Sequence, residues 1–133
     1  MIPTPYPEQN NSSEKFMKTI LVVEDTELNI DLITQLLEDD YNLLFAKDGA
    51  QGVAMAQQNN PDLILMDMSL PIMDGYEATR KIRETHKSTP IIGVSSHAMS
   101  GHEQSAKEAG CNDYLTKPIN DELMFKKLKE YLG

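Results

Sequence analysis

Five short apolar runs, each followed by a longer amphipathic stretch, constrain the fold of this chain more than any other feature. The runs begin at residues 19, 41, 62, 90 and 113, so their starts lie 21 to 28 residues apart. That spacing accommodates one strand, one helix and two short loops in each unit. Strands and helices that alternate in this way form α/β folds, in which right-handed crossovers join parallel strands.

The apolar runs differ in how deeply they can be buried. They are Thr19–Val23, Tyr41–Ala46, Asp62–Met66, Pro90–Val94 and Asp113–Thr116. Three of them are apolar on both faces, which is typical of strands buried between two layers of helices, whereas the polar start of the second indicates a strand nearer an edge. We therefore expect a doubly wound, five-stranded parallel sheet with the strand order 2-1-3-4-5, a flavodoxin-like three-layer (βα)5 sandwich.

Apolar residues at helical spacing mark the amphipathic stretches as helices. The first has Thr26 as its cap and Glu38–Asp40 as its last turn, and Asn59–Pro61 ends the second. The residues expected to face the core are Leu28, Leu32, Ile33, Leu36 and Leu37 in the first helix, Val53, Ala54 and Ala56 in the second, Tyr76, Thr79 and Ile82 in the third, Met99, Ala106 and Ala109 in the fourth, and Phe125, Leu128 and Leu132 in the fifth.

The first 17 residues differ in composition from the rest of the chain. They contain Pro3, Pro5 and Pro7, followed by a polar run from Gln9 to Ser13, with no apolar periodicity. Such a composition is typical of segments that do not fold. We therefore expect a disordered N-terminal tail over residues 1–17 and one folded domain over residues 18–133.

Charge and composition exclude several classes of function. The chain has 12 Lys and Arg against 21 Asp and Glu, a net charge of −9, which repels phosphate backbones and anionic lipid headgroups. No apolar run is long enough for a membrane span. Cys111 is the only cysteine, so we expect a buried thiol and neither an internal disulfide nor a cysteine metal cluster. These features predict a cytoplasmic protein that binds neither nucleic acid nor membrane.

Polar residues follow four of the expected strands. Glu24 and Asp25 follow the first strand, Asp67 the third, Ser95 the fourth and Lys117 the fifth. In the expected order these strands are neighbours, so their carboxyl ends meet at one edge of the sheet. Two carboxylates about 5 Å apart repel by roughly 3 kcal/mol at an effective dielectric of about 20, which favours a cation between them. Mg²⁺ is the expected ion, because it prefers oxygen ligands and keeps waters that a phosphoryl oxygen can replace.

Four stretches resemble the receiver domain of response regulators in two-component signalling, of the CheY-like single-domain type. They are ILVVEDTELN, PDLILMDMSLPIMDGYEATRKIR, PIIGVSSHAM and GCNDYLTKPI, and they keep the order and spacing of that family. The resemblance implies that a histidine kinase or a histidine phosphotransfer protein transfers a phosphoryl group to Asp67. It also implies that Asp25, Asp67 and the backbone carbonyl of Ser69 hold Mg²⁺, with Glu24 acting directly or through water.

The resemblance assigns roles to further residues around Asp67. Lys117 and the Ser95 hydroxyl are expected to stabilise charge on the phosphoryl oxygens. Ser95 and Tyr114 are expected to act as a switch that changes the affinity for protein partners, through the face formed by the fourth helix, the fifth strand and the fifth helix. The peptide bond between Lys117 and Pro118 is expected to be cis. Asn29 is expected to be exposed on the first helix, where a phosphodonor docks.

Two features depart from the common receiver pattern. The fourth strand closes with Ser95 and Ser96, where Thr-Ala is usual, and Gly93 stands where a small apolar residue is frequent. Serine lacks the threonine methyl group, so its hydroxyl has more rotamer freedom. The switch is therefore expected to be less sharply two-state.

Several interpretations remain open from the sequence. We expect no output domain after the fifth helix, so that the signal passes by protein contact or by onward phosphate relay; alternatively, the receiver belongs to a hybrid histidine kinase or a larger regulator. An aspartyl-nucleophile phosphatase needs a second aspartate two residues after the first, where Ser69 stands. A flavodoxin-like cofactor binder needs a phosphate loop where Glu24 and Asp25 repel an anion. We expect no enzymatic activity other than phosphoryl transfer to Asp67 and hydrolysis of the phosphorylated aspartate.

Overall fold

The computed structural model describes residues 17–96 and 101–133, which form five strands and five helices in strict alternation. The elements are β1 (Thr19–Val23), α2 (Glu27–Leu37), β2 (Asn42–Ala46), α3 (Gly49–Asn59), β3 (Leu63–Asp67), α4 (Gly75–Arg83), β4 (Ile91–Ser95), α5 (His102–Ala109), β5 (Asp113–Thr116) and α6 (Asp121–Leu132). The strands match the expected runs to within one residue at each end. Within these described ranges, no helix is long and apolar enough to cross a membrane.

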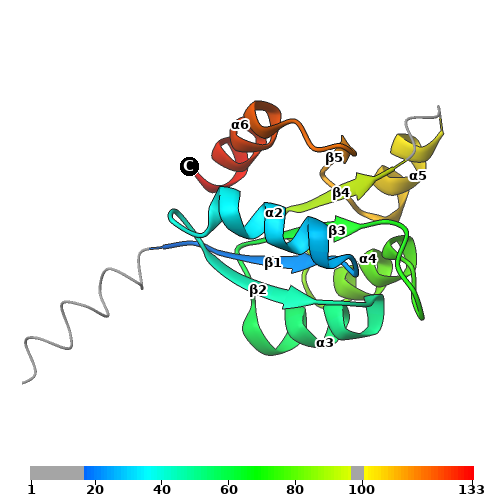
Figure 1. Cartoon of the computed structure of the whole chain (residues 1–133). Coiled ribbons are helices and arrows are strands. Elements are labelled where there is room, and N and C mark those ends of the chain that lie inside the picture. Colours follow the sequence, from blue (N-terminus) through cyan, green and yellow to red (C-terminus); the bar gives the residue numbers. More distant parts are fainter. Residues whose placement is uncertain (1–16, 97–100) are drawn as a thin grey trace, which may run out of the picture.

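The strands form one parallel sheet in the order β2-β1-β3-β4-β5. Helices α2 and α6 cover one face of the sheet, and α3, α4 and α5 cover the other (Figure 1). The doubly wound, three-layer fold expected from the sequence is thus confirmed. All five strands run in the same direction, so their carboxyl ends form a single edge.

Each face of the sheet packs against its own hydrophobic core. One core joins alternate residues of β1 and β3 to Ala56 of α3 and Ile82 of α4, and the other joins the remaining strand residues to Ile33 of α2 and Leu128 of α6. Residues of β3 and β4 are buried throughout, whereas β2 is half-buried over most of its length. The expected edge position of the second strand is therefore confirmed.

Three helices begin at side-chain caps that hold them against the strand ends. The carboxylates of Asp48 and Asp74 and the side-chain oxygen of Asn120 each accept a hydrogen bond from a backbone N–H in the first turn of α3, α4 and α6. Thr26 lies at the expected cap position of α2 but makes no side-chain cap hydrogen bond. Asn60, in the left-handed region at φ 47°, ends α3 where the sequence predicts.

The apolar face of α2 differs from the expected one. Ile30, Ile33 and Leu37 are buried, whereas Leu28 is 76% exposed and Leu32 is also exposed. The helix ends at Leu37, and residues 38–40 form a turn. Leu28 and Leu32 are spaced one turn apart, as core residues of a helix are, but they lie on its exposed side.

Two other helices show smaller departures. In α6 the buried residue is Met124, and Phe125 is 40% exposed; in α3 Ala54 is exposed. Cys111 is buried as expected, and burial raises the pKa of its thiol to about 11. Met99, expected on the fourth helix, lies outside the described residues.

Candidate functional site

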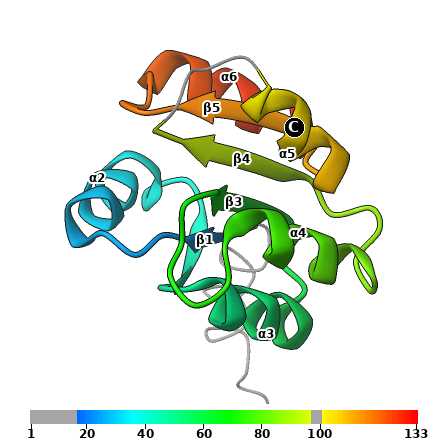
Figure 2. The same ribbon diagram turned by 90° about the vertical axis from the view of Figure 1, so that its right-hand side faces the viewer.

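The carboxyl edge of the sheet gathers the polar residues that the sequence places at the strand ends. Figure 2 looks onto this edge, with the ends of β1, β3, β4 and β5 side by side. Glu24 and Asp25 follow β1 directly, Asp67 is the last residue of β3, Ser95 is the last residue of β4 and Lys117 follows β5. The fold therefore brings together side chains that are up to 93 residues apart in the chain.

Three carboxylates crowd this edge. One carboxylate oxygen from each of Glu24, Asp25 and Asp67 lies within 4.8 Å of the other two. Glu24 is 3% exposed and Asp67 is 4% exposed, while Asp25 is exposed. Buried carboxylates at this separation repel one another strongly, and a cation is the group that relieves the repulsion.

Lys117 supplies one positive charge to the cluster. Its Nζ lies 3.1 Å from Oε1 of Glu24 and 3.2 Å from Oδ2 of Asp67, and the bond to Pro118 is cis, as expected from the sequence. Burial alone would lower the pKa of Lys117, but the two carboxylates outweigh it and raise that pKa. The lysine is therefore held as an ammonium between the two buried acids.

The surroundings of Asp67 disfavour its ionised form. Burial and the charge of Glu24 raise its pKa, although the backbone N–H of Ser69, 2.9 Å from Oδ1, and the Lys117 ammonium act in the opposite direction. Both carboxylate oxygens thus have a hydrogen-bond donor, yet the ionised form stays disfavoured relative to water. A buried carboxylate with a raised pKa is typical of a functional position.

Glu24 is oriented from the other side by α2. Its Oε2 accepts hydrogen bonds from the backbone N–H of Thr26 at 3.2 Å and from Nδ2 of Asn29 at 3.4 Å. The sequence predicts Asn29 to be exposed, but it is half-buried against the site. The first turn of α2 returns over the strand end, which brings a residue five positions along the chain back to Glu24.

Two glycines fix the loop that carries Asp67, and sequence reasoning missed both. A Cβ on Gly75 would lie 2.4 Å from the carbonyl oxygen of Asp67, and one on Gly49 would lie 1.9 Å from the carbonyl oxygen of Met73. The start of α4 therefore packs directly on the backbone of the β3 end. The signal in the sequence is the Asp74-Gly75 pair immediately before a helical pattern.

The two expected switch residues lie on β4 and β5. Ser95 is 1% exposed, whereas Ser96 is exposed, so the two serines at the end of β4 differ in burial. Asp67 pairs in register with Val94, so Ser95 lies one residue beyond the end of β3. Tyr114 is half-buried on β5, and its ring packs against Gly93 of β4, where a Cβ would lie 3.4 Å from the ring.

Comparison with known proteins agrees with this arrangement. Residues 20–129 match the response regulator receiver domain family. The chain belongs to the receiver domain family. It is 35% identical over 119 residues to the polar-differentiation response regulator DivK of Brucella ovis, an alignment that covers 87% of this chain and 97% of the relative. Family membership favours the signalling interpretation over the phosphatase and cofactor-binding alternatives.

Solved receiver domains show the same fold. The receiver domain of the sensor histidine kinase PA1611 from Pseudomonas aeruginosa, which has a magnesium ion in its active site cleft, is 37% identical with a TM-score of 0.82, covering 88% of this chain and 98% of that one. The receiver of Saccharomyces cerevisiae Ssk1, solved with the phosphotransfer protein Ypd1, is 29% identical with a TM-score of 0.81, covering 86% and 88%. The receiver domain described here therefore resembles both sensor kinase receivers and response regulators.

Proposed function

We propose that this receiver domain, residues 18–133, accepts a phosphoryl group on Asp67 from a histidine kinase or a histidine phosphotransfer protein, and that phosphorylation switches its protein contacts. The observation that carries the proposal is the cluster of three carboxylates with Lys117 bridging Glu24 and Asp67. A structural ion pair needs one acid for one lysine. The surplus of negative charge supports a site that receives a cation.

The donor set of the site fits Mg²⁺. The cluster offers carboxylate oxygens from three residues within 4.8 Å of one another, and Mg²⁺ selects oxygen ligands of this kind. We assign Asp25, Asp67 and the backbone carbonyl of Ser69 as its ligands, with Glu24 acting directly or through water. When bound, the ion supplies positive charge that stabilises the phosphoryl oxygens during transfer.

The residues of the chain have distinct tasks in the transfer. A carboxylate oxygen of Asp67 attacks phosphorus, the bond between phosphorus and the donor histidine nitrogen breaks, and that nitrogen keeps the electron pair. Lys117 stabilises the charge on one phosphoryl oxygen, and the Ser95 hydroxyl donates to another. The reaction runs once per donor and leaves the product on Asp67, so the domain acts as a signalling module.

The exposed leucines of α2 support a docking surface for the phosphodonor. Leu28 and Leu32 lie on the helix that begins beside Glu24 and Asp25, and Leu28 is among the most exposed large apolar side chains of the described residues. The Ypd1 and Ssk1 complex is a receiver domain bound to such a donor. We also propose the cytoplasmic location that the sequence predicts.

The output of the switch is proposed to lie on α5, β5 and α6. Phosphorylation adds negative charge and acceptor oxygens beside Ser95, which draws its hydroxyl toward the phosphoryl group. Tyr114 of β5 packs on Gly93 of β4, the strand that carries Ser95. A movement of β4 therefore reaches the tyrosine ring directly. The downstream partner is a protein whose affinity for this face differs between the phosphorylated and the unphosphorylated domain.

Phosphorylation with a small phosphodonor tests the proposal. Acetyl phosphate with Mg²⁺ should add one phosphoryl group to the wild-type chain, detected as a mass increase, and none without Mg²⁺. Asp67→Asn should abolish the mass increase, and Asp31→Asn, which neutralises an exposed acid on α2, should leave it unchanged. Equal labelling of the wild-type and Asp67→Asn chains would refute the assignment.

Transfer from a protein donor tests the docking surface separately. Leu28→Ser should slow transfer from a phosphorylated histidine phosphotransfer protein and leave acetyl phosphate labelling unchanged. Gln57→Ser, on the opposite face of the sheet, is the matched control and should affect neither rate. An equal loss with both donors would show that Leu28 acts on the site itself.

A further inference from the structure

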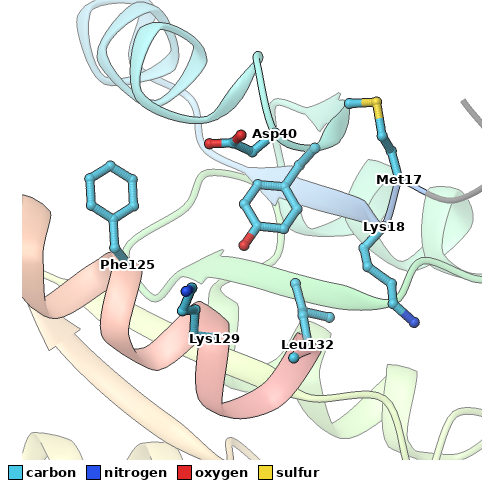
Figure 3. Close-up of a pocket in the computed structure, with 8 residues that line it drawn as sticks. Met17, Lys18, Asp40, Phe125, Lys129 and Leu132 are labelled. Carbon is cyan, nitrogen blue, oxygen red and sulfur yellow. The ribbon is translucent and has the colours of Figure 1, made fainter. Parts of the chain in front are cut away.

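A groove lies at the amino edge of the sheet, remote from the carboxylate cluster. It has a volume of about 520 Å³ and lies between the start of β1, the turn after α2, and α6. Figure 3 shows Phe125, Lys129 and Leu132 of α6 on one side, facing Asp40, Met17 and Lys18 on the other. A volume of this size falls in the range of small-molecule sites, about 300 to 1,000 Å³.

The lining of the groove combines aromatic rings with positive charge. Phe125 is 40% exposed, and the ring of Tyr41 also lines the groove. Among the lining side chains, Lys18 and Lys129 are basic and Asp40 is acidic. Grooves with exposed aromatic walls recognise proline-rich segments, because proline rings stack on them and the restricted backbone loses little entropy on binding. The lining therefore suits a proline-rich segment with acidic residues.

We propose that this groove is the docking site of the chain's own N-terminal segment, residues 1–16. That segment contains Pro3, Pro5 and Pro7 around Tyr6, and its two acidic residues are Glu8 and Glu14. Its apolar and proline residues match the aromatic walls. Its side-chain charge is −1, from Glu8 and Glu14 against Lys15, which is opposite to the +1 of the groove side chains Lys18, Lys129 and Asp40. The segment is thus complementary to the groove in both respects.

The connection to the domain makes this segment a better occupant than a free peptide of the same sequence. Met17, the next residue of the chain, itself lines the groove. Tyr6 lies eleven positions before Met17, which gives a reach of roughly 36 Å when extended and leaves ample length to return to the groove. A tether of this length provides an effective concentration in the millimolar range, so even a weak contact is occupied.

A spin label in the full chain tests the contact. Cys111 is buried, with a thiol pKa raised to about 11, so a cysteine introduced by Gln9→Cys is the one that reacts with a nitroxide reagent. The label should remove most of the amide signal intensity of Tyr41, Phe125 and Leu132 by paramagnetic relaxation. The same label at Gln57→Cys, on α3 and the opposite face of the sheet, should leave these signals intact.

Two exposed side chains of α6 give a matched pair of variants. Phe125→Ser removes an aromatic wall and should restore the amide intensities of Tyr41 and Leu132, and it should shift the amide signals of Tyr6 and Glu8. Leu123→Ser changes a residue of similar exposure, 42% against 40%, that does not line the groove, and it should do neither. Neither side chain belongs to the core, so both variants fold.

Two outcomes would overturn the proposal. Relaxation that is identical in the wild-type chain and in Phe125→Ser would show that the segment does not use the groove. Relaxation of the same amides in a mixture of spin-labelled, unenriched protein with unlabelled, nitrogen-15 protein would show that a second copy occupies the groove. Retained intensity in the mixture, with loss inside the singly labelled chain, supports docking within one chain.

Discussion

Two aspartates lie at opposite ends of the sheet, and each is paired with a lysine. Asp67 ends β3 at the carboxyl edge, 3.2 Å from Nζ of Lys117, and Asp113 begins β5 at the amino edge, 2.7 Å from Nζ of Lys127. The side chains of both lysines are 18% exposed. The pKa of Asp67 is nevertheless raised, whereas the pKa of Asp113 is lowered.

The difference lies in what surrounds each pair. Burial raises the pKa of both acids, but Asp113 has its lysine to itself and also accepts hydrogen bonds from the backbone N–H of Tyr114 and the hydroxyl of Tyr131. Asp67 shares its lysine with Glu24, whose charge opposes ionisation. The amino edge therefore satisfies its charges and stabilises the fold, and the carboxyl edge keeps unsatisfied charge for function.

Gly75→Ala should produce the largest effect, because it disturbs the backbone on which the carboxyl edge depends. The new Cβ would lie 2.4 Å from the carbonyl oxygen of Asp67 and 2.6 Å from Cα of Met68, and neither backbone atom can move freely. We expect a loss of about 3 kcal/mol in the free energy of unfolding and phosphorylation slowed about tenfold or more. Urea unfolding and acetyl phosphate labelling measure the two effects.

Gly52→Ala is the control for this change. Its Cβ would lie 3.0 Å from two methyl carbons of Val23, which are side-chain atoms, and alanine favours the helix by about 1 kcal/mol over glycine. We expect the free energy of unfolding to change by less than about 1 kcal/mol and the labelling rate to stay the same. Similar losses in both variants would show that the backbone contact at Asp67 is not special.

Arg83→Met should lower the stability of the fold without slowing the phosphorylation of Asp67, and so distinguish the roles of the two edges. The Arg83 guanidinium donates to the carbonyl oxygens of Gly110 and His86 and to Oδ1 of Asn112, at 2.7 to 2.9 Å, and so ties α4 to the loop before β5. We expect the free energy of unfolding to fall by about 2 kcal/mol. Labelling of Asp67 in the folded protein should keep its rate, because this network lies at the amino edge.

Arg80→Met is the matched control on the same helix. Arg80 is exposed, so its replacement should change the free energy of unfolding by less than about 0.5 kcal/mol. A loss as large as that of Arg83→Met would mean that the effect comes from charge on α4 and not from the hydrogen bonds.

The sequence predicts the carboxyl edge better than the amino edge, for a physical reason. The parallel order of the strands brings Glu24, Asp25, Asp67 and Lys117 to one edge whatever the details of packing, so a strand pattern is enough to predict their convergence. The hydrogen bonds of Arg83 depend on a side chain that reaches across loops, and no spacing of residues in the sequence predicts them. The same holds for the bond from Asn29 to Glu24.

Helix faces are the other place where the sequence misleads. Leu28 and Leu32 in α2 and Phe125 in α6 occur at helical spacing with true core residues, yet they are exposed. Periodicity reports that a face is apolar and does not report whether the core or a partner covers it. These three positions are among those that the proposals assign to a phosphodonor and to the N-terminal segment.

Asp67→Asn should stabilise the fold while it abolishes phosphorylation. Because the folded-state pKa of Asp67 is raised, its ionised form costs stability at neutral pH, and this cost disappears as the pH falls below that pKa. We expect a gain of about 1.5 kcal/mol in the free energy of unfolding at pH 7 without Mg²⁺. The gain should shrink toward pH 4, and Asp31→Asn should show none. A loss of stability at pH 7 would contradict the comparison of the two edges.

Lys127→Met should have the smallest effect and the opposite pH dependence. The folded-state pKa of Asp113 lies below its ordinary value of 3.8, so the stabilisation is present above pH 3.8 and is lost as the pH falls through the folded-state pKa. Methionine keeps most of the apolar stem, so we expect a loss of about 1 kcal/mol at pH 7.

Urea unfolding from pH 7 to pH 3 should show that the difference in the free energy of unfolding from wild type is constant above pH 5 and smaller below pH 4. Lys126→Met, at an exposed position of α6, is the control. A difference that does not depend on pH would assign the role of Lys127 to packing and not to its charge.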